Sequence, residues 1–131
     1  MRSCEVALVA LLAGCGTEHV LDEGTPPTTM VEETPIPVDP DVCETSFLSY
    51  DNFGEPFVLD WCRGCHSSAV PAGMRQKAPA AINFDTHADV QEWRDRIAAR
   101  AAAADATMPP AGGPTAEERK LLAEWLACGA R

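Results

Sequence analysis

The stretch between Gly16 and Glu44 contains no lysine or arginine, although it holds eight acidic residues. From Thr45 to Arg131 there are eleven acidic and nine basic residues, so this larger part is close to neutral. The formal net charge of −10 therefore arises mostly from one short segment. Because binding to DNA or RNA needs a basic surface on the folded part, this distribution argues against a nucleic-acid partner.

A hydrophobic run long enough to cross a membrane is also missing near the start of the sequence. The run from Val6 to Ala13 has eight apolar residues, whereas a membrane-spanning helix needs about 20. Its length fits the hydrophobic region of a secretory signal. The following Gly14-Cys15 completes a sequence that resembles the lipobox of bacterial lipoproteins. This resemblance implies cleavage that removes residues 1–14 as a signal peptide, with an ordinary cleavable signal or a buried strand as alternatives.

The lipobox resemblance also implies where the protein resides. Lipid attached to the sulfur of Cys15 would hold the exported chain at a membrane on the periplasmic side, because acyl chains bury in the bilayer. Gly16 follows the cysteine, and by the same resemblance this favours the outer membrane. Residues 15–42 are acidic, rich in proline and threonine and without aromatic side chains. Such a composition predicts a disordered linker between the lipid and a domain at residues 43–131.

The domain has helical patterns and no convincing strand, which predicts an all-α fold. We expect three main helices, at residues 53–65, 87–104 and 116–128, because apolar residues recur in each at helical spacing. Capping residues support these limits. The expected caps are Asn52 with Glu55 for the first helix, Thr86 or Asp85 for the second, and Thr115 with Glu118, ending at Gly129, for the third.

The sequence Cys62-Arg63-Gly64-Cys65-His66 has the C-x-x-C-H pattern by which c-type haem is attached. Two thiols three positions apart lie on the same side of a helical turn and can both bond to one porphyrin. The next residue, His66, would then bring its imidazole to the iron as the proximal ligand. Three short helices bury little apolar surface, so a prosthetic group would help such a domain to fold.

With this motif in place, residues 43–131 resemble a class I cytochrome c domain, and more closely the small monohaem cytochromes of bacterial lipoproteins. The resemblance implies a cytochrome c-like bundle around one covalent haem c. Its second axial ligand would be a methionine before the last helix, which is Met108 here, stiffened by Pro109 and Pro110. The resemblance also assigns to Pro79 the carbonyl that orients His66. Met74 is the rival methionine, and His87 the alternative ligand.

The resemblance gives an expectation for the remaining cysteines. Cys4 would leave with the signal peptide, and Cys43 and Cys128 remain near the two ends of the domain. In cytochromes c the first and last helices pack together, which implies a disulfide between these two residues. Such a bond would close a loop of roughly 85 residues and contribute about 4–5 kcal/mol in the chain-entropy model.

A haem iron with both axial positions filled transfers electrons and does not act on a substrate, so we expect an electron carrier that is not an enzyme. Its partner would be a redox protein that the sequence does not name. One alternative is a haem-based sensor, in which Met108 leaves the iron and a small molecule binds there. Another is a zinc or thiol redox module without haem, although no second ligand pair and no βαβ pattern accompany the C-x-x-C.

Overall fold

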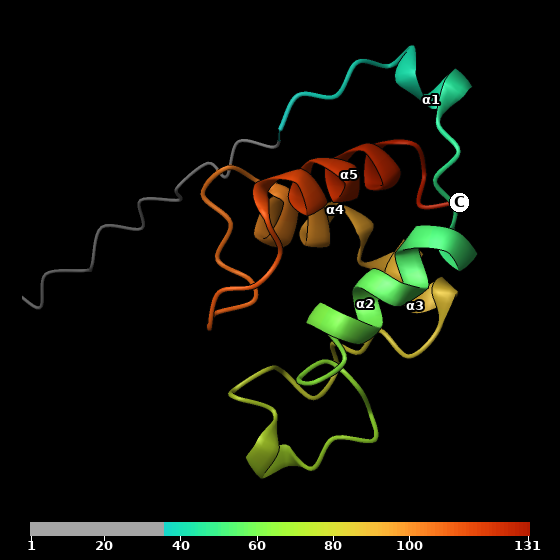
Figure 1. Cartoon of the computed structure of the whole chain (residues 1–131). Coiled ribbons are helices and arrows are strands. Elements are labelled where there is room, and N and C mark those ends of the chain that lie inside the picture. Colours follow the sequence, from blue (N-terminus) through green and yellow to red (C-terminus); the bar gives the residue numbers. More distant parts are fainter. Residues whose placement is uncertain (1–35) are drawn as a thin grey trace, which may run out of the picture. The chain divides into compact units, whose positions relative to one another are not determined.

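The structure is a computed structural model and describes residues 36–131. Within this range every regular element is helical, as the sequence predicts, and no strand is present (Figure 1). The expected signal peptide, the expected lipid attachment site at Cys15 and most of the expected linker lie outside the described residues. The elements are α1 (Val42–Thr45), η1 (Tyr50–Gly54), α2 (Glu55–Trp61), η2 (Ala72–Met74), α3 (His87–Glu92), α4 (Arg94–Ile97), η3 (Ala98–Ala102) and α5 (Ala116–Ala127).

The first expected helix is displaced toward the N-terminus, so the predicted limits at residues 53 and 65 were wrong. Ser49, and not Asn52, is the capping residue: its side chain accepts from the backbone N–H of Asn52, and the Asn52 side chain accepts from the N–H of Ser49. The reciprocal pair opens a π-helical turn that continues into α2. The helix then ends at Trp61, because the cysteine motif folds into turns.

The second expected helix is interrupted. Trp93 has φ −96° and ψ 8°, which ends α3, and α4 restarts with the next residue. Thr86 forms the predicted cap with Asp89 as its reciprocal partner. The last turns form the π-helical η3 and stop at Ala102, two residues before the expected end.

The last helix agrees closely with the prediction. Thr115 accepts from the N–H of Glu118, and the Glu118 carboxylate accepts from the N–H of Thr115. Beyond α5, Gly129 has φ 91°, the left-handed conformation that a glycine takes after a helix at little cost. The short α1 and η2 were not predicted, since four and three residues carry no readable periodicity.

The core forms where α5 packs against η1, α2 and η3. Trp125, Leu122, Leu126, Val58 and Val90 have the largest fully buried side chains. The Phe53 and Trp125 rings meet edge to face with their centroids 6.0 Å apart. A Cβ placed on Gly54 would lie 2.3 Å from the Trp125 ring, so this contact requires glycine.

The beginning and end of the domain are joined covalently and by hydrogen bonds. A disulfide links Cys43 of α1 to Cys128, with their Cα atoms 5.2 Å apart. The Tyr50 N–H donates to the carbonyl of Arg131, and the Arg131 guanidinium donates to the Cys43 carbonyl. These contacts hold α1 against the end of α5.

The last residues of the expected linker belong to the packed structure. Ile36 and Val38 lie against the hydrophobic core, in a groove bordered by α4, η3 and α5. The folded domain therefore starts several residues before residue 43.

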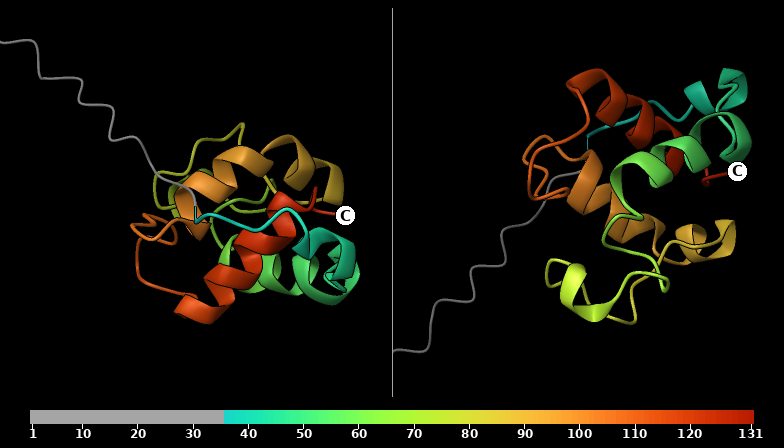
Figure 2. Two further views of the ribbon diagram at one scale, coloured as in Figure 1. Left: turned by 90° about the horizontal axis from the view of Figure 1, so that it is seen from above. Right: turned by 60° about the horizontal axis from the view of Figure 1, so that its bottom comes forward.

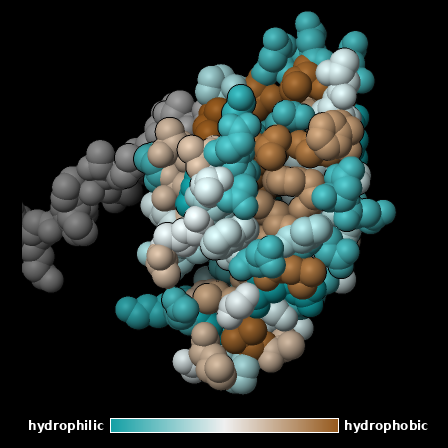
Figure 3. Space-filling model, in the orientation of Figure 1, coloured by the Kyte–Doolittle hydropathy of each residue, from teal (hydrophilic) through white to brown (hydrophobic). Residues whose placement is uncertain are grey.

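A long loop at residues 67–83 lies on the side of α2 away from α5, in the views of Figures 1 and 2. Its ends are joined by the Phe84 N–H, which donates to the carbonyl of His66 across 2.9 Å. In the space-filling view the lobe made by this loop is set off from the body by a narrow hollow (Figure 3). This loop and the helical body enclose the candidate site.

Candidate functional site

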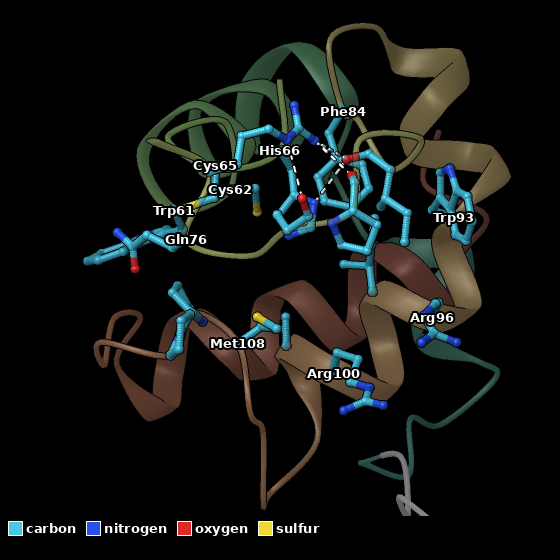
Figure 4. Close-up of a pocket in the computed structure, with 18 of the residues that line it drawn as sticks. Trp61, Cys62, Cys65, His66, Gln76, Phe84, Trp93, Arg96, Arg100 and Met108 are labelled. Atoms are coloured by element: carbon cyan, nitrogen blue, oxygen red, sulfur yellow. Dashed lines mark hydrogen bonds between the residues drawn. The ribbon is translucent and has the colours of Figure 1, made fainter. Parts of the chain in front are cut away.

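A cavity of about 400 Å³ brings together four of the residues predicted to hold a haem. Cys62, Cys65 and His66 line it from the end of α2, and Met108 lines it from the loop before α5. In the close-up, Met108 lies across the cavity from the other three (Figure 4). The volume falls within the range of about 300–1,000 Å³ typical of small-molecule and cofactor pockets. Met108 thus shares one cavity with the cysteine motif, although it lies at least 42 positions further along the chain.

The cysteine motif is positioned by the end of α2. The N–H groups of Cys65 and His66 both donate to the carbonyl of Cys62, at 3.1 and 2.9 Å. These bonds continue the turn beyond the helix and place the three side chains on the cavity wall. Both cysteines carry free thiols, so the site has two sulfur atoms available for bonding.

His66 is fixed in a form suited to binding a metal. Its ring stacks on Phe84 with centroids 4.9 Å apart, and Nδ1 lies 3.0 Å from the carbonyl oxygen of Ile82. Because that oxygen can only accept, the bond requires a proton on Nδ1, and in the neutral ring Nε2 then has the free lone pair. This is the arrangement in which neutral histidine ligates a metal while its second nitrogen is held by a carbonyl.

The expectation that Pro79 supplies this carbonyl was wrong. The Pro79 carbonyl instead accepts from the Arg75 guanidinium at 2.9 Å and from the Ile82 N–H at 3.1 Å. The turn closed by this second bond brings Ile82 forward to the His66 ring. A carbonyl has no sequence signature, so only the path of the loop decides which one faces the imidazole.

Arg75 is the most buried charged residue of the site, with 4% of its surface exposed. Its side chain lines the cavity and donates only to neutral acceptors of the 67–83 loop. These acceptors are the carbonyls of Ser67, Ala78, Pro79 and Ile82 and the side-chain oxygen of Asn83. The loop is therefore built around one guanidinium, which the sequence did not identify as a structural residue.

Met108 is held through its backbone. Its N–H donates to the carbonyl of Arg100 at 2.9 Å, and its carbonyl accepts from the Arg119 guanidinium at 3.0 Å. The side chain is 38% exposed and lines the cavity. A Cβ on Gly113 would lie 2.9 Å from the Pro109 ring, so the loop packs closely on itself beside Met108.

The competing ligands do not line this cavity. Met74 is 68% exposed in η2. His87 stacks on Tyr50 with ring centroids 4.2 Å apart, and its Nε2 lies within hydrogen-bond distance of the Ala130 carbonyl. Of the methionines and histidines in the described part of the chain, Met108 and His66 are thus the pair that the cavity brings together.

The wall of the cavity is apolar, and its charged residues all have one sign. Phe57, Trp61, Ile82, Phe84, Trp93 and Ile97 supply most of the apolar surface. Arg75, Lys77, Arg96 and Arg100 also line the cavity, and none of the aspartates and glutamates among residues 36–131 does. The cavity is therefore suited to a largely apolar ligand that carries negative groups.

Family models, curated protein sequences and solved structures give no match to this chain.

The environment of Cys62 bears on the thiol redox alternative. Burial raises the pKa of the Cys62 thiol to about 12. Reactive cysteines of thiol oxidoreductases have the opposite property, a lowered pKa that supplies thiolate near neutral pH. Within residues 36–131, no three His, Cys, Asp or Glu side chains come together as a zinc site would require.

Asp85 connects the cysteine motif to the residues that follow it. Its Oδ2 accepts from the Ser68 N–H at 2.9 Å, and Oδ1 lies 3.8 Å from Nε of Arg63. A hydrogen bond from the Ser67 side chain, together with bonds from Ser68, lowers the pKa of the Asp85 carboxyl to about 2. The carboxylate therefore ties the arginine inside the C-x-x-C-H sequence to the start of the loop that follows it.

Among residues 36–131, no helix is long and apolar enough to cross a membrane.

Proposed function

We propose that this chain is a one-electron carrier in which one haem c is bonded to Cys62 and Cys65 and ligated by His66 and Met108. The observation that carries the proposal is that one cavity collects these four side chains, although Met108 is distant in sequence. The apolar wall fits a flat porphyrin ring, and Arg96 and Arg100, which line the same cavity, fit its two propionate carboxylates. When bound, the haem iron supplies a couple that alternates between ferric and ferrous states.

The residues of the chain have separate roles in this proposal. The thiols of Cys62 and Cys65 form the thioether bonds that keep the group on the protein. His66 presents Nε2 because its Nδ1 proton is held by the Ile82 carbonyl. Met108 would supply the second protein ligand to the iron, which would leave no site for a substrate and favours electron transfer over catalysis.

The proposal includes the location of the protein. We place it on the periplasmic side of an envelope membrane, anchored through lipid on Cys15, with a redox protein as its partner. The redox partner would supply one electron to the site, and an acceptor would take it. The disulfide between Cys43 and Cys128 supports an oxidising compartment, because such bonds persist outside the reducing cytosol.

The test is production of the full chain in a host competent in cytochrome c maturation, followed by mass and visible spectra. We expect the mass of one haem in excess of the polypeptide and its lipid, and a spectrum that changes on reduction. The double variant Cys62→Ala/Cys65→Ala is expected to lose the added mass. A colourless wild-type protein from that host would refute the proposal.

A pair of methionine variants tests the sixth ligand. Met108→Leu is expected to abolish the weak red band that a methionine–iron bond gives in the oxidised protein. Met74→Leu, an equal change at an exposed position, is expected to retain it. Tight binding of carbon monoxide by the reduced wild-type protein at neutral pH would favour the sensor function instead, because Met108 would then have to leave the iron readily.

A further inference from the structure

The carbonyl oxygen of Ile82 receives two donors at once. His66 Nδ1 lies 3.0 Å from it, and Nη2 of Arg75 donates to it across 3.1 Å. Figure 4 shows His66 at the cavity, with hydrogen bonds among the residues drawn as dashed lines. A group that orients the proposed iron ligand is therefore shared with a buried cation.

The charge of Arg75 is not neutralised by its neighbours. All of its acceptors are carbonyl or amide oxygens, and in the part of the chain described by the structure no carboxylate forms an ion pair with it. The side chain is 4% exposed, so water screens the charge poorly. The guanidinium therefore places a persistent positive potential at the Ile82 carbonyl and at the cavity beside it.

We propose that Arg75 is a positioning residue that raises the reduction potential of the haem by competing with His66 for the Ile82 carbonyl. The inference rests on the proposed haem and assigns a residue that tunes the reduction potential of that haem.

Two physical effects of Arg75 both raise the reduction potential of the haem. A carbonyl that already accepts from a cation has less electron density to offer, so it accepts the His66 proton more weakly. A hydrogen-bond acceptor at the second nitrogen of a histidine ligand raises the basicity of that ligand. A weaker bond at Nδ1 therefore makes the imidazole of His66 a poorer electron donor to the iron. The poorer donor disfavours the ferric state. The ferric form also carries one more positive charge than the ferrous form, and a nearby buried cation repels it.

The experiment compares variants of the full haem-loaded chain that alter Arg75 in different ways. Arg75→Gln removes the charge and keeps a shorter donor. Asn83→Asp leaves Arg75 in place and puts a carboxylate where the amide oxygen now accepts at 2.9 Å, which neutralises the guanidinium. Lys77→Gln is the matched control, because it removes a cation that also lines the cavity without a bond to Ile82.

Three quantities are measured for each variant: the mass of the attached haem, the midpoint potential, and the proton resonance of His66 Nδ1–H in the reduced protein. For Arg75→Gln we expect the equilibrium constant for reduction to fall about tenfold, which corresponds to about 59 mV for one electron. The Nδ1–H resonance should move to lower field, because the hydrogen bond to Ile82 strengthens. Lys77→Gln should shift the potential less and leave the resonance in place.

The outcomes separate this inference from the function on which it rests. If the wild-type chain carries no haem, the proposed function fails. If the haem is attached, but Arg75→Gln and Lys77→Gln give the same potential and the same Nδ1–H resonance, the role of Arg75 is refuted while the function stands. If Arg75→Gln does not fold, Asn83→Asp decides, since it should lower the potential and move the same resonance, and unchanged values refute the role.

Discussion

The guanidinium of Arg119 donates to the backbone carbonyl of Met108 across 3.0 Å. The same Nη1 also donates to the Ala101 carbonyl in η3. Arg119 lies in the second turn of α5, so one side chain connects the last helix, the preceding helical segment and the methionine loop. The position of the proposed sixth ligand therefore depends on a residue that does not line the cavity.

We predict that Arg119→Ala weakens the bond between Met108 and the iron. A hydrogen bond from a charged donor contributes about 1.5–3 kcal/mol, and because Arg119 is half-buried we take the lower value. Loss of this hydrogen bond should increase about tenfold the population of molecules in which the Met108 loop has moved away from the iron. The red band of the oxidised protein should diminish, and carbon monoxide should bind the reduced protein more readily. Lys120→Ala, a change at the exposed neighbouring position, should leave both properties unaltered.

We predict that Gly54→Ala destabilises the domain by about 1–3 kcal/mol, the usual cost of forcing extra volume into a packed core. The added Cβ would lie 2.3 Å from the Trp125 ring, and that indole is fully buried and donates to the Arg131 carbonyl. To make room for the methyl group, either η1 must shift away from α5 or the Trp125 ring must move. The measurement is the urea midpoint of the haem-loaded chain, with Gly73→Ala as the control.

The control is matched because a Cβ on Gly73 meets no atom within 4 Å. Equal midpoints for the two alanine variants would contradict the close contact between Gly54 and Trp125.

The sequence predicted the parts of the site that are encoded locally. Cys62, Cys65 and His66 lie within one five-residue motif, so only a turn is needed to bring them together. The cap of α5 was predictable for the same reason, because Thr115 and Glu118 are three residues apart. Met108 came from resemblance to a family, and the structure places it in the same cavity as the motif.

The rest of the site depends on how a loop without periodicity folds. The choice of Ile82 over Pro79 as the partner of His66 follows from a turn inside residues 67–83. Arg75 looks in the sequence like an ordinary surface arginine, and only the converging carbonyls reveal that it is buried. The break at Trp93 was likewise unpredictable, because the apolar pattern continues through it.

We predict that the double variant Cys43→Ser/Cys128→Ser lowers the free energy of unfolding by up to about 4–5 kcal/mol, as the chain-entropy model gives for a loop of this length. The two residues are 85 positions apart, so the bond restricts most of the unfolded domain. Chemical unfolding of the haem-loaded chain checks the value. Because Cys62 and Cys65 stay intact, the attached haem should be unaffected. A variant as stable as the wild type would contradict a stabilising role for the disulfide.

The last prediction concerns acid. The folded chain holds the pKa of Asp85 at about 2, below its ordinary value of 3.8, through hydrogen bonds from Ser67 and Ser68 and the nearby Arg63. A carboxyl with a lowered pKa binds its proton less readily when folded. Its contribution to stability is therefore present above pH 3.8 and is lost as pH falls toward 2. The urea midpoint of the wild type should decline across this interval.

Asp85→Asn isolates this contribution from those of the other carboxyls. The variant should be less stable than the wild type at neutral pH, because the amide keeps neither the charge facing Arg63 nor both acceptor oxygens. The difference between the two proteins should shrink as pH falls from 4 to 2. Asp105→Asn, at an exposed position, should follow the wild-type curve. A gap between Asp85→Asn and the wild type that stays constant down to pH 2 would contradict the lowered pKa, because protonation would then not remove what Asp85 contributes.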